Sequence, residues 1–197
     1  LKKLESRIGY VSGATGAVYA IRRSLFNQLP NNCINDDFTI SMKIIEKGYK
    51  CIYTENAIVY ENVAPSVKSE FKRHIRDATG HYISIIHLYK LINPFLGLRS
   101  FIFWSHRLLR WSVPFFMIFI FFSNIFLLNL DFYFSIFLTQ ISFYFLALVG
   151  LIFHNKKKLS VVFYVPFYFT NLNFSLLVGF FNSLFYKQTG MWNSTQR

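Results

Sequence analysis

Residues 111–154 contain no lysine or arginine, and Asp131 is their only acidic residue. A helix needs about 20 apolar residues to cross a hydrocarbon core of about 30 Å, because each residue adds about 1.5 Å. The run is therefore long enough for two crossings. Polar Asn129 and Asp131 near its centre predict the turn of a helical hairpin, with spans over 111–130 and 132–153.

A third uncharged stretch covers residues 159–186. It is long enough for one tilted span. Pro166 and several asparagines also allow two short interfacial or re-entrant pieces, because Asn at membrane depth is costly unless it faces protein or water. The number of crossings here and the side of the C-terminus stay open.

Basic residues flank the first two predicted spans on both sides. They are Arg99, Arg107 and Arg110 before the first span, and Lys156, Lys157 and Lys158 after the second. Because cytoplasmic flanks of spans are enriched in Lys and Arg, both flanks are expected in the cytoplasm. The sequence thus predicts a multi-pass protein of the cytoplasmic membrane, with its polar part on the cytoplasmic face.

The polar part has a different composition. Residues 1–110 hold 16 of the 21 basic and 8 of the 9 acidic residues, and the chain has a formal net charge of +12. Lys and Arg beside a bilayer are attracted to anionic head groups, so this charge requires no nucleic-acid partner. Cys33, Cys51 and the five histidines lack zinc-binding spacing, so no metal site is expected in this chain.

Local patterns in the polar part predict a small α/β piece. A glycine-rich segment precedes a short predicted strand at 18–21. A helix is expected to begin at Asn35 or Asp36 and to end at Gly48. Alternating aromatic and β-branched residues over 49–61 predict a second strand.

Two amphipathic helices are expected to follow. Apolar residues from Phe71 to Tyr89 recur at steps of three and four, which predicts about six helical turns. Arg73 and Arg76 lie off this stripe and fit a solvated face, a head-group contact or a phosphate clamp. Residues 97–110 mix arginine with aromatic side chains, as interfacial helices do.

Taken in order, these features resemble the processive, membrane-integrated family 2 glycosyltransferases. That group includes hyaluronan, chitin-oligosaccharide, poly-N-acetylglucosamine and cellulose synthases. The segment SGATGAVYAIRRSLF resembles the family's acceptor segment, NDD resembles its acidic pair, and RHIRD resembles Q-x-x-R-W. The run SHRLLRWSVP and the C-terminal W-x-x-T-x-R, with Trp192, Thr195 and Arg197, resemble the tails of bacterial members.

The chain departs from the family pattern at three positions. Asp36 replaces the commoner Glu, Arg73 stands at the Gln position, and Asp77 stands where Trp is expected. On pattern alone, Asp36 and Asp37 also suit a helix N-terminus, where the helix dipole favours carboxylates.

The resemblance implies a role for each motif. Asp37, with Asp36 beside it, would be the catalytic pair, and Asp37 would accept the proton of the acceptor hydroxyl. Arg73 and Arg76 would bind the departing diphosphate. The acceptor-binding segment would contain Gly13, Thr15 and Gly16.

It also implies an organisation. The expected fold class is α/β, the C-terminal part of a GT-A glycosyltransferase domain, followed by interfacial amphipathic helices and about three transmembrane helices. The expected regions are the acceptor and base segment at 1–65, interfacial helices at 66–110, the membrane region at 111–186 and a tail at 187–197.

The family binds nucleotide and metal through an N-terminal half with a D-x-D motif, and this sequence has no D-x-D. It also has no initiator Met or signal peptide, which predicts a C-terminal fragment. Mg²⁺ or Mn²⁺ would be bound through the other half, and this chain alone would be inactive. The expected partners are a nucleotide sugar such as a UDP-sugar, a glycan acceptor, the lipid bilayer and that N-terminal half.

The function expected from the resemblance is inverting transfer of a sugar from a nucleotide-diphosphate sugar to a polysaccharide or glycan acceptor. Two alternatives stay open. One is a non-catalytic membrane subunit for assembly or transport, whose basic half binds anionic lipid. The other is a non-processive enzyme that transfers one sugar to a lipid carrier.

Overall fold

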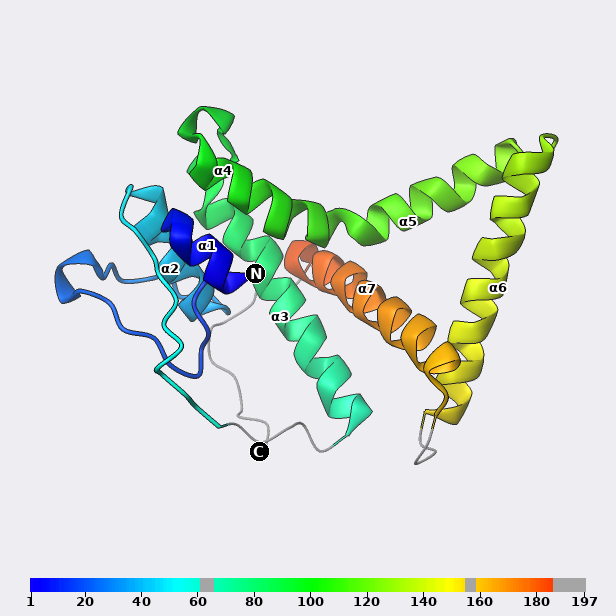
Figure 1. Ribbon diagram of the computed structural model, residues 1–197, viewed down its shortest axis with the longest axis horizontal. Helices are drawn as coiled ribbons and strands as arrows, with labels where there is room; N and C mark the ends of the chain where they lie inside the picture. Colours follow the sequence, from blue (N-terminus) through cyan, green and yellow to red (C-terminus); the bar gives the residue numbers. More distant parts are fainter. Residues whose placement is uncertain (61–65, 155–158, 186–197) are drawn as a thin grey trace. The chain divides into compact units, whose positions relative to one another are not determined.

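A computed structural model describes residues 1–60, 66–154 and 159–185 (Figure 1). The described chain is dominated by helices. Their bounds are α1 Lys2–Ile8, α2 Asp36–Glu46, α3 Val67–His87, α4 Leu98–Phe103, α5 Leu109–Phe126, α6 Asp131–Phe153 and α7 Val161–Phe185. Short 3₁₀ turns lie at Arg23–Leu25, Tyr89–Ile92 and Pro94–Leu96, and a π-helical turn lies at Trp104–Leu108.

The chain divides into two compact units. The first comprises Leu1–Trp111 with the C-terminal segment from Val178, and the second comprises Ser112–Leu177. Each unit is described by itself below.

In the first unit, α2 forms where the sequence predicts it. The helix begins at Asp36 and is followed by Gly48, whose φ of +92° lies in the left-handed region that glycine tolerates. Its apolar positions form the core of this unit, with Met42 and Ile45 almost completely buried. Asn35 is the N-cap residue by position, but its side chain makes no capping bond.

Helix α3 confirms the predicted long amphipathic helix. Ser66 caps it, because its side chain accepts a hydrogen bond from the backbone N–H of Ser69. Apart from Ile83, its buried residues are small. A Cβ added at Gly80 would lie 2.5 Å from Oδ1 of Asn35, and one added at Gly179 of α7 would lie 2.5 Å from Cβ of Ala78. The small residues therefore permit close packing of α3.

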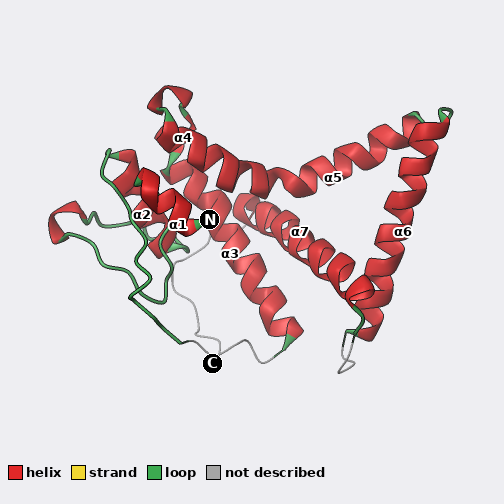
Figure 2. Ribbon diagram, viewed as in Figure 1, coloured by secondary structure: helices red, strands yellow, loops and turns green. Residues whose placement is uncertain are grey.

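Neither predicted strand forms in the described part of the chain, so the α/β character expected for this segment is not seen (Figure 2). Isolated bridges join Tyr10 to Cys51 in parallel and Thr15 to Val18 in antiparallel orientation. A strand is stabilised by ladder bonds to a neighbour. Beyond one parallel bridge, the segment 49–60, which turns at residues 55–56, has no such neighbour among the described residues.

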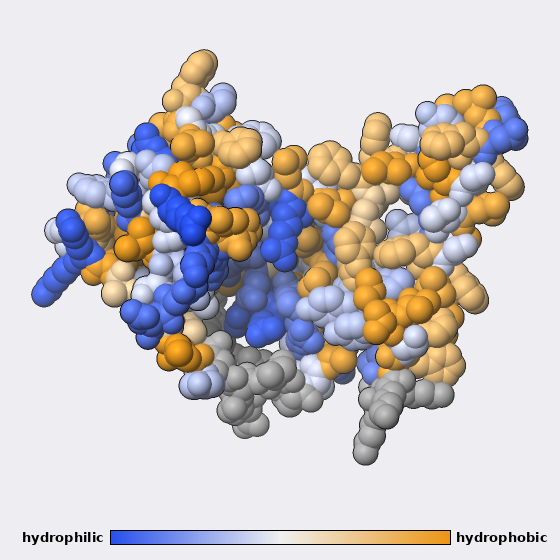
Figure 3. All heavy atoms as spheres, in the orientation of Figure 1, coloured by the Kyte–Doolittle hydropathy of each residue, from blue (hydrophilic) through white to orange (hydrophobic). Residues whose placement is uncertain are grey.

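Three helical segments are long and apolar enough to cross a membrane: Leu98–Phe126, Asp131–Phe153 and Val161–Phe185. The first runs without a break through α4, the π-helical turn and α5. The third is one continuous helix with Pro166 inside it, so the stretch after residue 159 does not split into two pieces. Hydrophobic side chains cover much of the visible surface of α5 and α6 (Figure 3).

Two asparagines inside the second unit have protein partners. Nδ2 of Asn124 on α5 donates to Oε1 of Gln140 on α6 over 3.0 Å. Asn173 is only 7% exposed, and its Nδ2 donates to the carbonyl oxygen of Phe169 over 2.8 Å. These bonds provide the protein contacts that polar groups need at membrane depth.

The lysines at 156–158 and the C-terminal motif of Trp192, Thr195 and Arg197 lie outside the described residues.

Candidate functional site

The acidic pair forms the first turn of α2. Asp36 is exposed, whereas Asp37 is half-buried. The backbone N–H of Asp37 donates to Oδ1 of Asp36 over 2.9 Å. Although adjacent in sequence, the two carboxyl groups therefore have different surroundings.

Burial is the main reason why the pKa of Asp37 is raised above its ordinary value. The nearby carboxylates of Asp36 and Asp77 raise it further, while the backbone N–H of Phe38 and the guanidinium of Arg107 act in the opposite direction. A carboxylate with a raised pKa binds a proton more readily than a solvated one. Readiness to bind a proton is one property that a general base requires.

The glycine-rich segment lies directly on the first turns of α2. A Cβ added at Gly16 would lie 3.0 Å from Oδ2 of Asp37, and one added at Gly13 would lie 2.7 Å from Cδ2 of Phe38. The N–H of Ala14 donates to Oγ of Ser41 over 2.9 Å. Glycine is required at 13 on a second ground, because its φ is +108°.

The structure thus brings two of the three predicted acceptor residues, Gly13 and Gly16, to the start of α2. Thr15 is different. It is exposed, and its hydroxyl oxygen accepts a hydrogen bond from Nζ of Lys2.

Asn35 connects the acidic pair to α3. Its Nδ2 donates to the carbonyl oxygen of Asp77 over 2.8 Å and to Nδ1 of His81 over 2.9 Å. The imidazole of His81 is stacked on Trp111, with ring centroids 4.7 Å apart. Burial lowers the pKa of His81 to about 3, and the charges of Arg107 and Arg110 act in the same direction. His81 is therefore neutral at physiological pH and able to accept from Asn35.

The two predicted diphosphate residues are placed differently. Nε and Nη2 of Arg76 donate to Oδ1 of Asp77 over 3.2 and 2.9 Å. Asp77 is also the residue whose carbonyl oxygen accepts from Asn35, next to the acidic pair. Arg73, one turn earlier, is exposed, and among the described residues it has no hydrogen bond or ion pair. Both guanidinium groups are at least partly accessible to an anion.

Some site residues were missed by the sequence reasoning. Glu5, which is 3% exposed, accepts hydrogen bonds from N–H and Oγ of Ser12 and pairs with Nδ1 of His106. Next to His106, Nη2 of Arg107 donates to the carbonyl oxygen of Ser12. The available signal was the occurrence of charged residues within an otherwise apolar segment at 97–110.

The described residues form no ready-made cluster of metal ligands. No group of three or more His, Cys, Asp or Glu side chains in the described ranges is arranged to bind a metal ion. The groups available here for chemistry are the Asp37 carboxyl group with its raised pKa, the glycine-rich segment and the arginines of α3.

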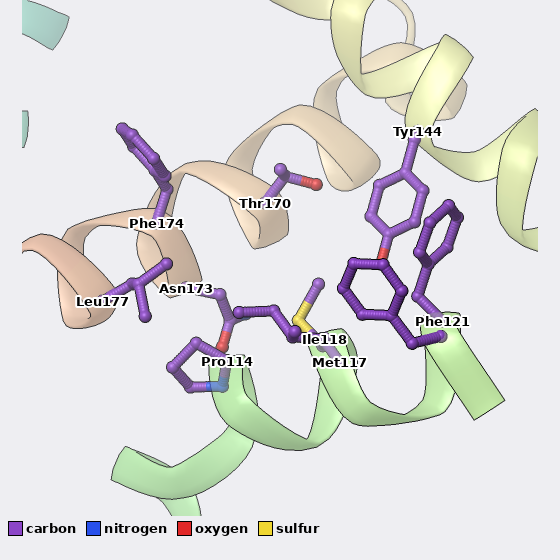
Figure 4. Close-up of a pocket in the computed structure, with 10 residues that line it drawn as sticks. Pro114, Met117, Ile118, Phe121, Tyr144, Thr170, Asn173, Phe174 and Leu177 are labelled. Atoms are coloured by element: carbon purple, nitrogen blue, oxygen red, sulfur yellow. The ribbon is translucent and has the colours of Figure 1, made fainter.

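A cavity of about 280 Å³ lies within the second unit, among α5, α6 and α7 (Figure 4). Its walls are mostly apolar, and they include Pro114, Met117, Phe121, Phe174 and Leu177. Tyr144 is the titratable group among its lining residues, so the cavity lacks the acid–base pair that transfer chemistry uses.

Comparison with known families gives one match. The family model described as Glycosyl transferase family group 2 matches residues 2–182. The chain therefore belongs to the family 2 glycosyltransferases. In the same comparisons, no curated protein and no solved structure matches it. The membership confirms the resemblance at the level of the family and of glycosyl transfer.

Proposed function

We propose that this chain carries the acceptor side of an inverting glycosyltransferase that uses a nucleotide-diphosphate sugar at the cytoplasmic face of a membrane. The observation that supports this best is the close approach of Gly16 to the Asp37 carboxyl group, where a Cβ at position 16 would lie 3.0 Å from Oδ2. In the proposal, the acceptor hydroxyl reaches Asp37 across the glycine-rich segment.

The proposed step is a single displacement. The acceptor oxygen attacks C1 of the donor sugar, its proton passes to Oδ2 of Asp37, and the bond from C1 to the diphosphate breaks. Attack from the face opposite the leaving group inverts the configuration at C1. General-base help of this kind contributes about 10² to 10⁴ in rate.

Arginine suits the charge that forms on the departing diphosphate. Guanidinium remains protonated and binds phosphate oxygens in pairs, so Arg76, and Arg73 one turn earlier, are proposed to bind the leaving group. In the described structure Arg76 is held by Asp77, and diphosphate would compete for the same donors.

Donor binding is proposed to require residues outside those described. Mg²⁺ or Mn²⁺ would neutralise diphosphate charge, bound through an N-terminal half that also carries the nucleotide site. Transfer of a hexose, synthesis of a cell-envelope polysaccharide and use of a UDP-sugar belong to the same proposal and rest on family membership.

The test is a transfer assay on membranes that express this chain with and without its upstream coding region. Several radiolabelled UDP-sugars are offered, and the product is sized. Incorporation only with the upstream region is expected, and product length distinguishes polymerisation from single transfer to a lipid carrier. No incorporation in either preparation, with the chain inserted, would favour the non-catalytic assembly or transport subunit.

Asp37→Asn provides the matched test of the base. It should abolish transfer in the active preparation while membrane insertion persists. Asp131→Asn is the control, because Asp131 is an exposed aspartate at the start of α6. Turnover retained by Asp37→Asn would exclude Asp37 as the base.

A further inference from the structure

The π-helical turn Trp104–Leu108 holds the glycine-rich segment from two adjacent side chains. Nη2 of Arg107 donates to the carbonyl oxygen of Ser12. His106 acts through Glu5, which accepts both the N–H and the hydroxyl of Ser12 at 3.0 and 2.8 Å. π-Helical turns are uncommon and occur frequently at functional sites. Here the turn holds Ser12 by both of its backbone groups, the carbonyl directly through Arg107 and the N–H through Glu5.

Arg107 also packs on the start of α2. Its guanidinium lies over the ring of Phe38, 4.9 Å from the centroid. A Cβ added at Gly13 would lie 3.0 Å from Nη2 of Arg107. Arg107 therefore occupies the space that a side chain at position 13 would need, and it connects the loop to the residue after Asp37.

One atom of Arg107 carries a cost in stability. Nε of Arg107 is buried without a hydrogen-bond partner among the described residues. A buried, unpaired donor on a charged group destabilises a fold, and an apolar residue of similar size would avoid that cost. A contribution to the site around Asp37 would explain why position 107 carries a guanidinium group despite this cost.

The charges around Asp37 point to that role. Asp36 on α2 and Asp77 on α3 both disfavour ionisation of Asp37, whereas Arg107 favours it. Tyr19 and Cys33, from the preceding loop, also interact electrostatically with the acidic pair, but both are neutral at physiological pH because their pKa values are raised, mainly by burial. Arg107 thus opposes two acidic neighbours.

We propose that Arg107 is a positioning residue, which holds the Ser12–Gly16 loop over Asp37 and, from its place over the ring of Phe38, supplies a positive charge at the start of α2 for the proton transfer. The loop-holding part follows from the contacts alone. The proton-transfer part rests on the proposed function. Arg107 acts through Ser12 and Asp37, and no contact of Arg107 with the reacting sugars is required.

The first arm of the test is the pH dependence of kcat/KM in the active membrane preparation. Arg107→Met removes the charge at similar length, and the acidic limb of its profile should move to higher pH than that of the wild type. Arg107→Lys restores the charge and should return the limb toward the wild-type position. Arg110→Met is the matched control, because Arg110 is exposed one turn later on the same helix.

The second arm needs no activity. Ala14→Cys, in a Cys33→Ser, Cys51→Ser background, places a thiol in the middle of the loop, and its rate of reaction with a polar maleimide reports loop opening. Adding Arg107→Met should raise this rate several-fold, whereas adding Arg110→Met should leave it unchanged. Size-exclusion profiles in detergent show that each variant is folded.

The outcomes separate the two claims. Unchanged labelling and an unchanged acidic limb in folded Arg107→Met would overturn the proposal. If Arg107→Met raises the labelling rate but Arg107→Lys fails to return the acidic limb of the pH profile toward the wild type, Arg107 only holds the loop. That result would overturn the electrostatic part of the proposal. If the wild type shows no transfer, the proposed function fails while the labelling arm still decides whether Arg107 holds the loop.

Discussion

Nδ2 of Asn35 donates to the carbonyl oxygen of Asp77 over 2.8 Å. Asn35 precedes the acidic pair, and Asp77 follows Arg76 at the end of the RHIRD motif. Two motifs more than 40 positions apart in sequence therefore share one hydrogen bond. This hydrogen bond fixes the position of α3, which carries Arg73 and Arg76, against α2, which carries the candidate base Asp37.

Asn35→Ala tests this connection. It would remove one donor to the carbonyl of Asp77 and the donor to Nδ1 of His81, and each lost hydrogen bond costs about 0.5–1.5 kcal/mol. We expect a lower thermal unfolding temperature for the purified chain in detergent. Asn56→Ala, at an exposed position, should change stability by no more than about 0.5 kcal/mol. Equal unfolding temperatures for the two variants would contradict the connection.

The two glycines of the loop should respond differently to alanine. Gly13→Ala forces a side chain into a backbone with φ +108° and against Phe38, so we expect a loss of stability of about 1–3 kcal/mol. Gly16 lacks a positive φ, and its Cβ would meet only the Asp37 carboxylate. Gly16→Ala should therefore lower transfer while the unfolding temperature stays near that of the wild type. The reverse pattern would show that Gly16, rather than Gly13, is structural.

Asp37→Asn should also change the pH dependence of stability. Because the folded pKa of Asp37 lies above its ordinary value of 3.8, folding disfavours the ionised form. The contribution of Asp37 is present below the unfolded pKa and is lost as pH rises through the folded pKa. At pH 7 the Asn variant should unfold at the same or a higher temperature than the wild type.

Thermal melts at pH 7 and near pH 3 measure this difference. Any advantage of Asp37→Asn at pH 7 should shrink at the lower pH, where the wild-type carboxyl is protonated. A variant less stable than the wild type at pH 7 would show that the carboxylate stabilises α2, as expected for a simple helix cap.

Gly150→Val tests packing in the second unit. A Cβ at position 150 of α6 would lie 2.5 Å from the carbonyl oxygen of Phe163 on α7. Backbone cannot move aside as a flexible side chain can, so overpacking of about 1–3 kcal/mol is expected. Ile152→Val, at an exposed position two residues later, is the control in the same detergent melt. Similar melts for both variants would indicate that α6 and α7 do not pack closely here.

Local patterns in the sequence predicted the helices well. Helix α3 follows its three- and four-residue apolar period, the predicted turn includes Asn129, and α6 begins at Asp131. The strands could not be predicted in the same way, because pairing depends on a neighbour; residues 49–60 find only the bridge at Cys51.

The candidate site was predicted only in part. The acidic pair and Gly16 were identified by motif, and the structure brings them together. Arg107 was not, since its bond to Ser12 joins residues 95 positions apart and leaves no local pattern. Asp77 counted as a departure from the family motif, yet it pairs with Arg76 and raises the pKa of Asp37.

The contact between Gly80 and Asn35 also restricts how this protein can diverge. Oδ1 of Asn35 occupies the volume where even a single methyl group at position 80 would lie. A larger residue at 80 is tolerable only with a smaller one at 35, so the two positions should change together in natural homologues. Exposed Lys72 on the same helix should drift independently.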